Sequence, residues 1–239
     1  MMNRMEVILV TAACCLAFVC SPLPSINRSG ATSLTPSSSS SSDFTDVDSD
    51  YWASAAIQSL VRAGVVNGYP DGSFRPEQLV SRAEFAKMIV TALDLSFVLV
   101  EYPSFPDVPG NHWALTYVET ALMNDLMKGY PDGLFQPSGK ITLAEILTVI
   151  VRAKDWSLVD PPDPPPQLLV WEAGESVRPL TSTDWFYQTV GAAMAGELLS
   201  FPEDPHLASP GPGSDEYRIH FQEPANRAQT AFLLDRMMR

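Results

Sequence analysis

The sequence contains a duplicated stretch, and its period restricts the fold more than any other feature. Residues 44–93 are followed by a second copy at an offset of 61 residues, with fourteen identical motif positions between Phe44 and Glu84 and no gap. The shared motifs are Phe-x-Asp-Val at 44–47 and 105–108, Trp-Ala at 52–53 and 113–114, and Gly-Tyr-Pro-Asp-Gly-x-Phe-x-Pro at 68–76 and 129–137. A fixed period of this kind indicates a repeated supersecondary unit.

Each copy begins with a predicted helix and a turn-rich loop. Apolar residues recur with a spacing near 3.6 after Trp52 and after Trp113. Asp50 and Asn111 are candidate N-caps of these two helices, and we expect Gly64 to end the first of them. The Gly-Tyr-Pro-Asp-Gly motif favours a tight turn, because Pro fixes φ, Asp bonds the nearby backbone and Gly accepts a positive φ.

A second helix is predicted after the turn in each copy. Ser81-x-x-Glu84 and Thr142-x-x-Glu145 have the pattern of capping boxes, in which the hydroxyl and the carboxylate satisfy backbone amides at the start of a helix. Apolar residues follow both boxes at helical spacing. The repeated unit is therefore predicted to be helix, loop, helix.

These motifs resemble the S-layer homology domain family, whose repeats contain F-x-D-V, W-A, G-Y-x-D-G-x-F-x-P and T-R-A-E in that order. The resemblance covers residues 44–153, and several motifs agree in both order and spacing. It implies an all-α fold in which three helix-loop-helix repeats pack as a pseudo-threefold bundle. It also implies non-covalent binding of bacterial cell-wall polysaccharide, and it requires a third repeat.

A degenerate third repeat is expected near the C-terminus. Residues 182–185 resemble the start of the first helix and residues 226–229 resemble a capping box, but the Phe-x-Asp-Val and Gly-Tyr-Pro-Asp-Gly motifs are missing. We therefore divide the chain into a signal peptide or membrane anchor (1–20), a flexible Ser/Pro linker (21–43), repeats at 44–100 and 101–160, a stiff Pro-rich connector (161–181) and a degenerate third repeat (182–239).

The N-terminal segment predicts export to the cell envelope, at the wall surface or in the periplasm. Arg4 precedes an almost entirely apolar stretch at residues 5–20, which is a secretory signal pattern. Cleavage near residues 29–31, lipidation at Cys20 and retention as a membrane tether are alternative fates. All three cysteines lie within the first 20 residues, so the exported domain has no disulfide of its own.

Charge and composition exclude several classes of partner. A formal net charge of −13 repels phosphates, so nucleic-acid binding is not expected. The histidines lack the spacing of metal ligands, and the turns at Asp71 and Asp132 lack the alternating carboxylates of a calcium loop. No metal and no cofactor are therefore expected.

The resemblance implies a wall polymer that is acidic because it carries pyruvate ketals. Arg offers a planar donor fork for a carboxylate, Trp offers an apolar face, and Gly allows close backbone approach. The family motifs then give these glycan-binding candidates: Asp46, Trp52, Gly68 and Arg82 in the first repeat, Asp107, Trp113 and Gly129 in the second, and Trp185 and Arg227 in the third.

One departure from the family pattern reduces the expected number of sites. Leu143 stands where the second repeat would carry its Arg, so that groove should lack its main anion donor, and one or two sites should survive. Structural roles compete for the same residues, because Trp rings at helix starts are often core and Arg82 can pair with Asp46.

Three classes of function follow from this pattern. The first is a wall-polymer-binding anchor without enzymatic activity. The alternative is a structural or protein-interaction module of the envelope, whose degenerate repeats no longer bind glycan. A wall hydrolase is disfavoured, because no catalytic domain accompanies the repeats.

Overall fold

The computed structural model describes residues 44–161, 167–172, 176–199, 208–210 and 216–239. The predicted signal segment with Cys20 and the predicted linker lie outside the described residues. Ser41–Arg239 form one compact unit. Within the described ranges the chain forms six helices: α1 (Ser54–Arg62), α2 (Arg82–Ala92), α3 (Leu115–Met123), α4 (Leu143–Ala153), α5 (Tyr187–Ala195) and α6 (Arg227–Met238).

The second helix of each repeat begins as the capping boxes predict. The side chains of Ser81 and Thr142 accept from the amides of Glu84 and Glu145, and both carboxylates return a bond to the cap amide. Asn226 and Gln229 form the same box at the start of α6. The three boxes therefore fix where α2, α4 and α6 start.

The predicted caps of the first helices are wrong. The N-cap positions of α1 and α3 are Ala53 and Ala114, and neither helix has a side-chain cap. Backbone turns replace the cap, since the amide of Ser54 donates to the carbonyl of Tyr51 at 2.8 Å and the second repeat has the same contact. Asp50 and Asn111 are therefore not needed to satisfy these amides.

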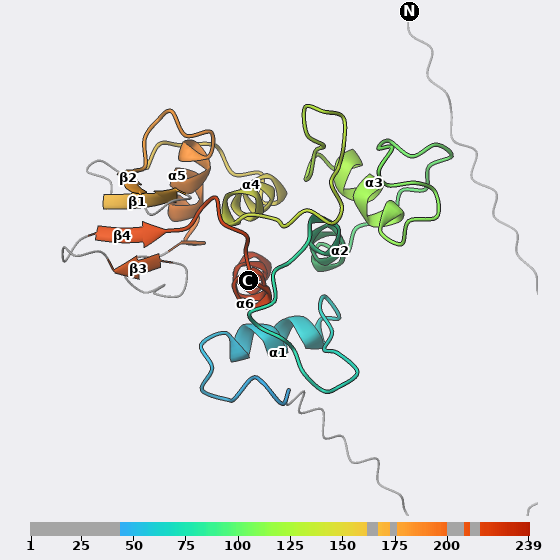
Figure 1. Ribbon diagram of the computed structural model, residues 1–239, viewed down its shortest axis with the longest axis horizontal. Helices are drawn as coiled ribbons and strands as arrows, with labels where there is room; N and C mark the ends of the chain where they lie inside the picture. The colour runs from blue at the N-terminus through green and yellow to red at the C-terminus, as the bar shows by residue number, and fades with distance from the viewer. Residues whose placement is uncertain (1–43, 162–166, 173–175, 200–207, 211–215) are drawn as a thin grey trace, which may run out of the picture. The chain divides into compact units, whose positions relative to one another are not determined.

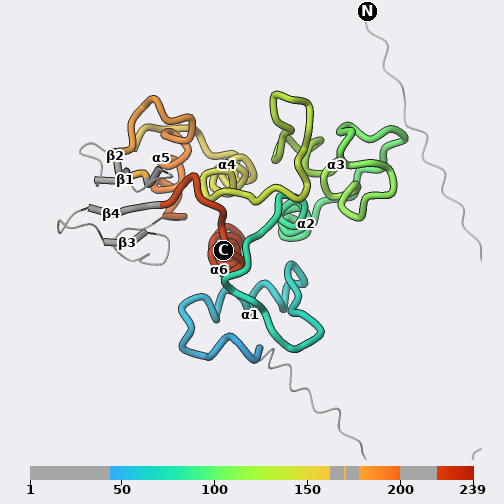
Figure 2. The backbone as a smooth tube through the Cα atoms, viewed as in Figure 1, coloured from blue at the N-terminus to red at the C-terminus, as the bar shows by residue number. Residues whose placement is uncertain are grey.

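Each helix of a repeat packs against a helix of a neighbouring repeat. The closely packed pairs are α1 with α6, α2 with α3 and α4 with α5, so the first helix of one repeat lies against the second helix of the preceding one. Figure 1 shows α2, α4 and α6 together in the middle of the bundle, with α1, α3 and α5 outside them. The backbone trace in Figure 2 alternates between outer and inner helices along the chain. The pairing of α1 with α6 closes the set.

Three backbone hydrogen bonds close the centre of the bundle. The amide of Val80 donates to Ala225 at 3.0 Å, the amide of Ala225 donates to Ile141 at 2.9 Å, and the amide of Ile141 donates to Val80 at 3.0 Å. These residues occupy the same place before α2, α4 and α6. The three segments therefore form a closed ring with approximate threefold symmetry, and the third helix pair completes it.

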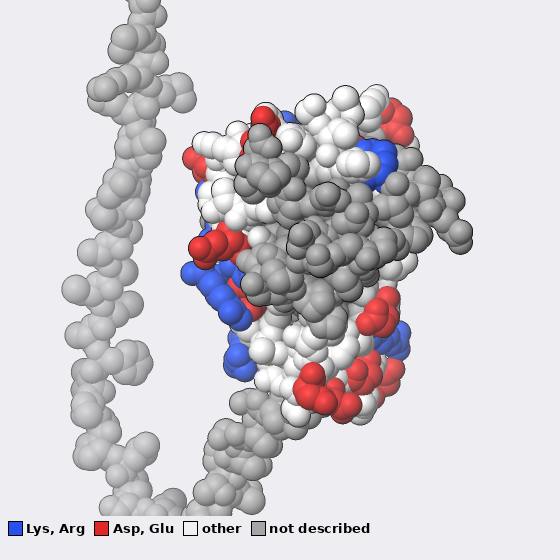
Figure 3. All heavy atoms as spheres, turned by 90° about the vertical axis from the view of Figure 1, so that its left-hand side faces the viewer, with Lys and Arg blue, Asp and Glu red and all other residues white. Residues whose placement is uncertain are grey.

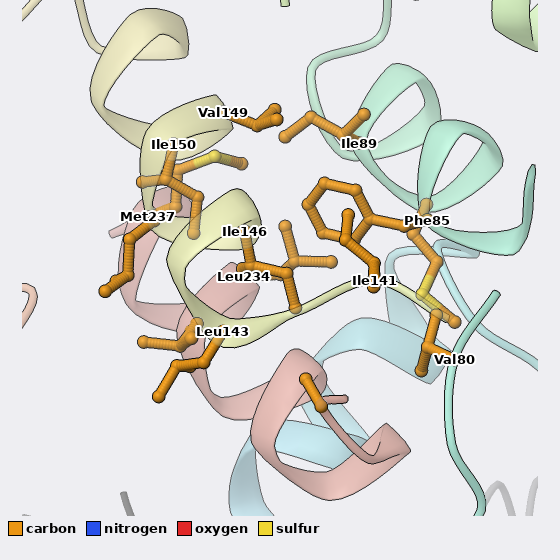
Figure 4. Close-up of a cluster of buried hydrophobic side chains, with 14 of the residues drawn as sticks. Val80, Phe85, Ile89, Ile141, Leu143, Ile146, Val149, Ile150, Leu234 and Met237 are labelled. Carbon is orange, nitrogen blue, oxygen red and sulfur yellow. The ribbon is translucent and has the colours of Figure 1, made fainter. Parts of the chain in front are cut away.

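The core lies between the three inner helices. Figure 4 shows Phe85 and Ile89 of α2 facing Ile146 and Val149 of α4, with Leu234 of α6 beside them. All five side chains are buried. Burial of aliphatic and aromatic groups of this size stabilises the fold by about 1.5–3 kcal/mol for each side chain.

The predicted all-helical repeat architecture is confirmed, but the third repeat also carries a small sheet that the sequence analysis missed. Its strands are β1 (Gln167–Glu172), β2 (Ser176–Pro179), β3 (Ala208–Pro210) and β4 (Glu216–Ile219). They lie in the order β2-β1-β4-β3, with β1 and β4 parallel and the outer pairs antiparallel. The extended connector supplies β1 and β2, while the insertion before α6 supplies β3 and β4.

Charged side chains on the face that includes this sheet are unevenly spread. Figure 3 shows basic and acidic groups side by side along one edge, and acidic groups gathered at the lower end, at the level of α1. The described part of this face therefore has no continuous basic surface of the kind that nucleic-acid binding requires.

Candidate functional site

Arg82 is buried at a junction between two repeats. Its Nε donates to the carbonyl of Phe135 at 2.9 Å and its Nη2 donates to the carbonyl of Lys128 at 2.8 Å. Its Nη1 donates to Glu145 Oε1 at 2.8 Å, forming an ion pair. The guanidinium also lies over the ring of Tyr130, 4.4 Å from its centre. The side chain of Arg82 therefore has a strong structural role, and its partner is Glu145 rather than Asp46.

The guanidinium of Arg82 nevertheless lines a hollow, which we name the first groove. The hollow has a volume of about 160 Å³. Gly129, Tyr130 and Glu145 line it together with Arg82, and Trp185 of the third repeat contributes its indole, which is 61% exposed. Burial, followed by the hydrogen bond to Glu145, raises the pKa of Tyr130, so its hydroxyl stays protonated as a donor.

Arg227 lies at a second junction with the same construction, which we name the second groove. Its Nε donates to Phe74 and its Nη2 to Asn67, both at 2.9 Å, as Arg82 does to Phe135 and Lys128. The hollow has a volume of about 300 Å³. Gly68, Tyr69, Glu84, Lys87 and the indole of Trp113, which is 57% exposed, also line it.

The two arginines differ in their charge partners. Among the described residues, no carboxylate forms an ion pair with Arg227, whereas Glu145 pairs with Arg82. Burial lowers the pKa of Arg227, but an arginine remains charged at any pH at which the protein is folded. The second groove therefore presents a buried cation whose charge is not neutralised by a direct contact.

The third junction lacks such a cation. Leu143 occupies the position of Arg82 and Arg227 and is buried in the core, as Figure 4 shows. Trp52, which stands where Trp113 and Trp185 stand, is half-buried, and its ring packs edge-on against Phe232 at 5.4 Å. Among the described residues, the position of Arg82 and Arg227 thus carries no guanidinium at this junction, and Trp52 takes part in packing. Arg236 of α6 lies nearby, but its Nη1 donates to the carbonyl of Leu198 at 3.0 Å and its guanidinium lies over the ring of Phe232.

A common rule describes the two grooves. Each takes its Arg from one repeat, its Gly-Tyr loop and capping acid from the next repeat, and its Trp from the one after. In the second groove these are Arg227, the loop of residues 65–69 with Glu84, and Trp113. Neither groove exists within a single repeat, so the closed ring of three units is required to build them.

The two aspartates of the Phe-x-Asp-Val motifs accept hydrogen bonds from the backbone. Asp46 accepts from the amides of Phe74 and Arg75, both at 2.7 Å. Asp107 accepts from the amides of Phe135 and Gln136 in the same way. Arg75 has a φ of 58°. Each Asp therefore holds the end of the turn-rich loop, and neither carboxylate lines the first or second groove.

Gly68 and Gly129 have a packing role that the sequence does not reveal. A Cβ at Gly68 would lie 2.3 Å from the ring of Phe44, and a Cβ at Gly129 would lie 2.3 Å from the ring of Phe105. These contacts join the Phe-x-Asp-Val motif to the loop. Both glycines also line a groove. The lack of a side chain at these positions therefore allows the close packing and also leaves the groove open.

The predicted tight turns are present. In the first copy the amide of Gly72 donates to Tyr69 at 3.0 Å, and Gly72 has a φ of 81°. Asp71 accepts from the amide and the hydroxyl of Ser73. These bonds, the hydroxyl first, and the pairing with Arg75 lower the pKa of Asp71. The carboxylate is thus occupied by its own turn.

Sequence reasoning did not single out several polar residues that line the grooves, among them Tyr69, Glu84 and Lys87 in the second and Tyr130, Glu145 and Arg152 in the first. Glu145 was interpreted only as a capping residue. In the structure its Oε2 accepts from Thr142, while its Oε1 accepts from Arg82 and Tyr130. The available signal for Tyr69 and Tyr130 was their place within the repeated Gly-Tyr-Pro-Asp-Gly motif.

Two further properties concern the described residues only. No cluster of His, Cys, Asp and Glu has the arrangement of a metal site among them. None of their helices combines the length and the apolar character needed to cross a membrane. His112 stacks on Trp113 with ring centres 5.8 Å apart, which agrees with a packing role.

The closed set of helix pairs, with grooves formed between repeats, defines a helical repeat protein with hollows at two of its junctions. Residues 43–86 and 104–147 match the model of the S-layer homology domain. This part of the chain belongs to the S-layer homology domain family. The match covers the first two repeats, and the third helix pair shares their construction in the structure.

Similar proteins are named as components of the bacterial cell surface. The chain is 35% identical over 124 residues to Cell surface glycoprotein 1 of Acetivibrio thermocellus, covering 48% of this chain and 5% of that protein. It is 34% identical over 128 residues to the Cellulosome-anchoring protein of the same organism, covering 52% and 28%. It is 31% identical over 120 residues to S-layer protein EA1 of Bacillus anthracis, covering 50% and 14%. The chain therefore spans much less than two thirds of each of these relatives.

Proposed function

We propose that the chain is a non-enzymatic anchor, exported to the bacterial cell envelope, that binds an acidic, pyruvylated wall polysaccharide or a peptidoglycan-linked glycan in the first and second grooves. The observation that carries this proposal is the guanidinium of Arg227, which lies without a paired carboxylate in a hollow beside an exposed indole and a glycine. A ligand carboxylate would supply the missing counter-charge, and Trp113 would supply an apolar face for the sugar.

The second groove is proposed to bind more tightly than the first. Glu145 already neutralises Arg82, so an anionic sugar in the first groove must compete with a carboxylate that is held in place. Lys87 lines the second groove, while Lys128 and Arg152 line the first, so the proposed difference rests on the pairing of Arg82 with Glu145. Within this proposal Arg227, Trp113 and Gly68 contact the glycan in the second groove, and Arg82, Trp185 and Gly129 do so in the first.

The remaining candidates are assigned to supporting positions. Asp46 and Asp107 hold the loops that carry the groove glycines, and Trp52 packs at the junction that lacks its Arg. Two grooves on one chain increase retention on a polymer through effective concentration. The membrane tether at the N-terminus, by lipid or by a retained segment, belongs to the same proposal.

Sedimentation with isolated bacterial wall sacculi tests this function, with the purified full chain in mild detergent. Trp113→Ala and Lys87→Glu alter groove residues whose side chains are not deeply buried, and both should lower the bound fraction several-fold. Lys154→Glu is the matched control, since it makes the same charge change at an exposed position outside both grooves. Removal of pyruvate from the walls by mild acid should release the wild-type chain.

Two results would count against the proposal. One is wall binding that Trp113→Ala, Lys87→Glu and the double variant leave at the wild-type level. The other is no sedimentation of the wild-type chain with walls of any source. The second result, together with a stable protein partner, would favour an envelope protein-interaction module instead.

A further inference from the structure

A second hollow adjoins the first groove, and the proposed acidic-sugar site does not use it. It has a volume of about 470 Å³, which lies within the range of about 300–1,000 Å³ usual for small-ligand pockets. It shares Thr148, Arg152 and Trp185 with the first groove, so the two spaces lie next to each other at Trp185. Trp156 and Asp155 line its other side, and we name it the Trp156 hollow.

The indole of Trp156 is held rigidly at this position. A Cβ on Gly196, at the end of α5, would lie 2.3 Å from Trp156 Cη2, so the ring packs directly on the backbone of that residue. The ring is half-buried and also lines the hollow. A second indole, that of Trp185, is 61% exposed and lines the same space. Two indoles in one hollow offer apolar faces to a sugar ring at little entropic cost.

The equivalent place beside the second groove carries larger side chains. Four residues after the Trp, the second repeat has Tyr117 where the third has Thr189, and Phe97 stands where Leu158 stands one period later. The rings of Phe97 and Tyr117 pack edge-on at 5.4 Å. The chain thus has aromatic rings beside the second groove and a hollow beside the first. The second groove therefore serves as an internal comparison for the effect of filling the hollow.

The charges of the Trp156 hollow differ from those of the grooves. Asp125 and Asp155 line it together with Arg152, so acidic groups outnumber basic ones. Asp125 is paired with Lys128 at 3.0 Å, while no described group bonds the carboxylate of Asp155. Carboxylates accept hydrogen bonds from sugar hydroxyls but repel a second carboxylate. With Asp125 paired to Lys128, the hollow offers acceptors for the hydroxyls of a neutral sugar and has no net positive charge that would favour an acidic one.

We propose that the Trp156 hollow is a second saccharide subsite, which binds a neutral sugar of the polymer whose acidic sugar occupies the first groove. That one polymer fills both the hollow and the first groove rests on the proposed function. Binding of a neutral sugar in the hollow does not require the acidic sugar. A polymer lying along Trp185 would contact both spaces. The subsite would compensate for the neutralised Arg82 by adding contacts that the second groove lacks.

The test uses NMR signals of the tryptophan indoles in the full chain, assigned by single Trp→Phe substitutions. The probes are a neutral N-acetylhexosamine disaccharide and a pyruvylated N-acetylhexosamine monosaccharide. The neutral disaccharide should shift the signals of Trp156 and Trp185 in the wild type. Thr189→Tyr places in the hollow the ring that Tyr117 places in the second repeat, and it should weaken this binding at least fivefold. Gln188→Tyr, one residue away on the exposed surface, is the matched control and should bind as the wild type does.

The outcomes test the neutral-sugar subsite separately from the proposed anchoring function. Unchanged signals of Trp156 with the neutral disaccharide, or equal binding by a folded Thr189→Tyr variant, would overturn the subsite. If Thr189→Tyr does not fold, Asp155→Asn takes its place, since Asp155 is exposed and its φ of 51° suits asparagine, and it must weaken the neutral probe. A shift at Trp156 with no response at Trp113 to the acidic probe would refute the proposed function and leave the subsite standing.

Discussion

Arg82 of the first repeat and Glu145 of the second form an ion pair, with Nη1 and Oε1 separated by 2.8 Å. The side chain of Arg82 is 5% exposed and that of Glu145 is 19% exposed. The pair thus joins two repeats beneath the first groove and at the same time lowers the positive charge of that groove. If the first groove binds an anion as proposed, Glu145 should favour stability and oppose anion affinity.

Glu145→Gln should separate these two effects. Glutamine keeps the capping box, as Gln229 does at the start of α6, but it removes the negative charge beside Arg82. We expect a loss of about 1–2 kcal/mol in the free energy of unfolding, because a charge-assisted bond is weakened. We also expect several-fold tighter binding of the acidic monosaccharide, measured at the indole signal of Trp185. Weaker binding by this variant would contradict the assigned role of Glu145. Glu84→Gln, which breaks no ion pair with Arg227, is the control.

The helices could be predicted because their signals are local. A capping box, a tight turn and a helical apolar face each lie within a dozen residues, and the repetition of all three made the prediction specific. The helix partners could not be predicted in the same way. The packing of α1 against α6 joins residues more than 150 positions apart, and no local pattern specifies it.

The sheet and the groove contacts escaped prediction for related reasons. β1 and β4 pair in parallel, with Leu168 opposite Tyr217, and the Pro-rich sequence around them gives no alternating pattern. Glu145 had a sufficient local role as a capping residue, so its second contact with Arg82 was not apparent. The choice of Arg82 and Arg227 as candidates came from the family motif, whereas their different charge partners depend on tertiary contacts.

Leu143→Arg should not restore a third groove. Leu143 is 2% exposed and lies among the core side chains of α4 and α6. The third repeat lacks the Gly-Tyr-Pro-Asp-Gly loop whose neighbouring carbonyls accept from Arg82 and Arg227, so an arginine there would bring a charge into the core without those acceptors. We expect a loss of about 3 kcal/mol or more in the free energy of unfolding. Leu143→Met, which conserves volume, should cost less than about 1.5 kcal/mol. Urea unfolding measures both variants. A stable Leu143→Arg chain with increased wall retention would show that the third junction can accept the cation.

Gly129→Ala should destabilise the fold by about 1–3 kcal/mol, because the added methyl group overlaps the ring of Phe105 at 2.3 Å and approaches the carbonyl of Leu134 at 3.0 Å. Gly110→Ala is the matched control, since a Cβ there meets no atom within 4 Å. It should change the free energy of unfolding by no more than about 0.5 kcal/mol. Equal urea midpoints for the two variants would show that the packing of the Phe105 ring does not require a glycine at position 129.

Asp184 should make stability depend on pH at the start of the third repeat. The side chain of Arg178 donates to both carboxylate oxygens of Asp184, and the amide of Thr181 donates to one of them. The bond from Arg178 is the largest cause, and it lowers the pKa of Asp184 in the folded protein. A carboxyl whose folded pKa is depressed contributes stability above the unfolded value, which is about 3.9. That contribution is lost as the pH falls through the folded pKa.

The pH dependence is measured as a difference between the wild type and Asp184→Asn, so that the titration of other carboxylates cancels. The wild type should be more stable at pH 7 by about 1–3 kcal/mol, and the difference should shrink as the pH falls below about 4. Arg178→Gln removes the other partner and should give a difference with the same trend. A gap between wild type and Asp184→Asn that is constant from pH 7 to pH 2 would contradict a lowered pKa of Asp184 and a stabilising role of its charge.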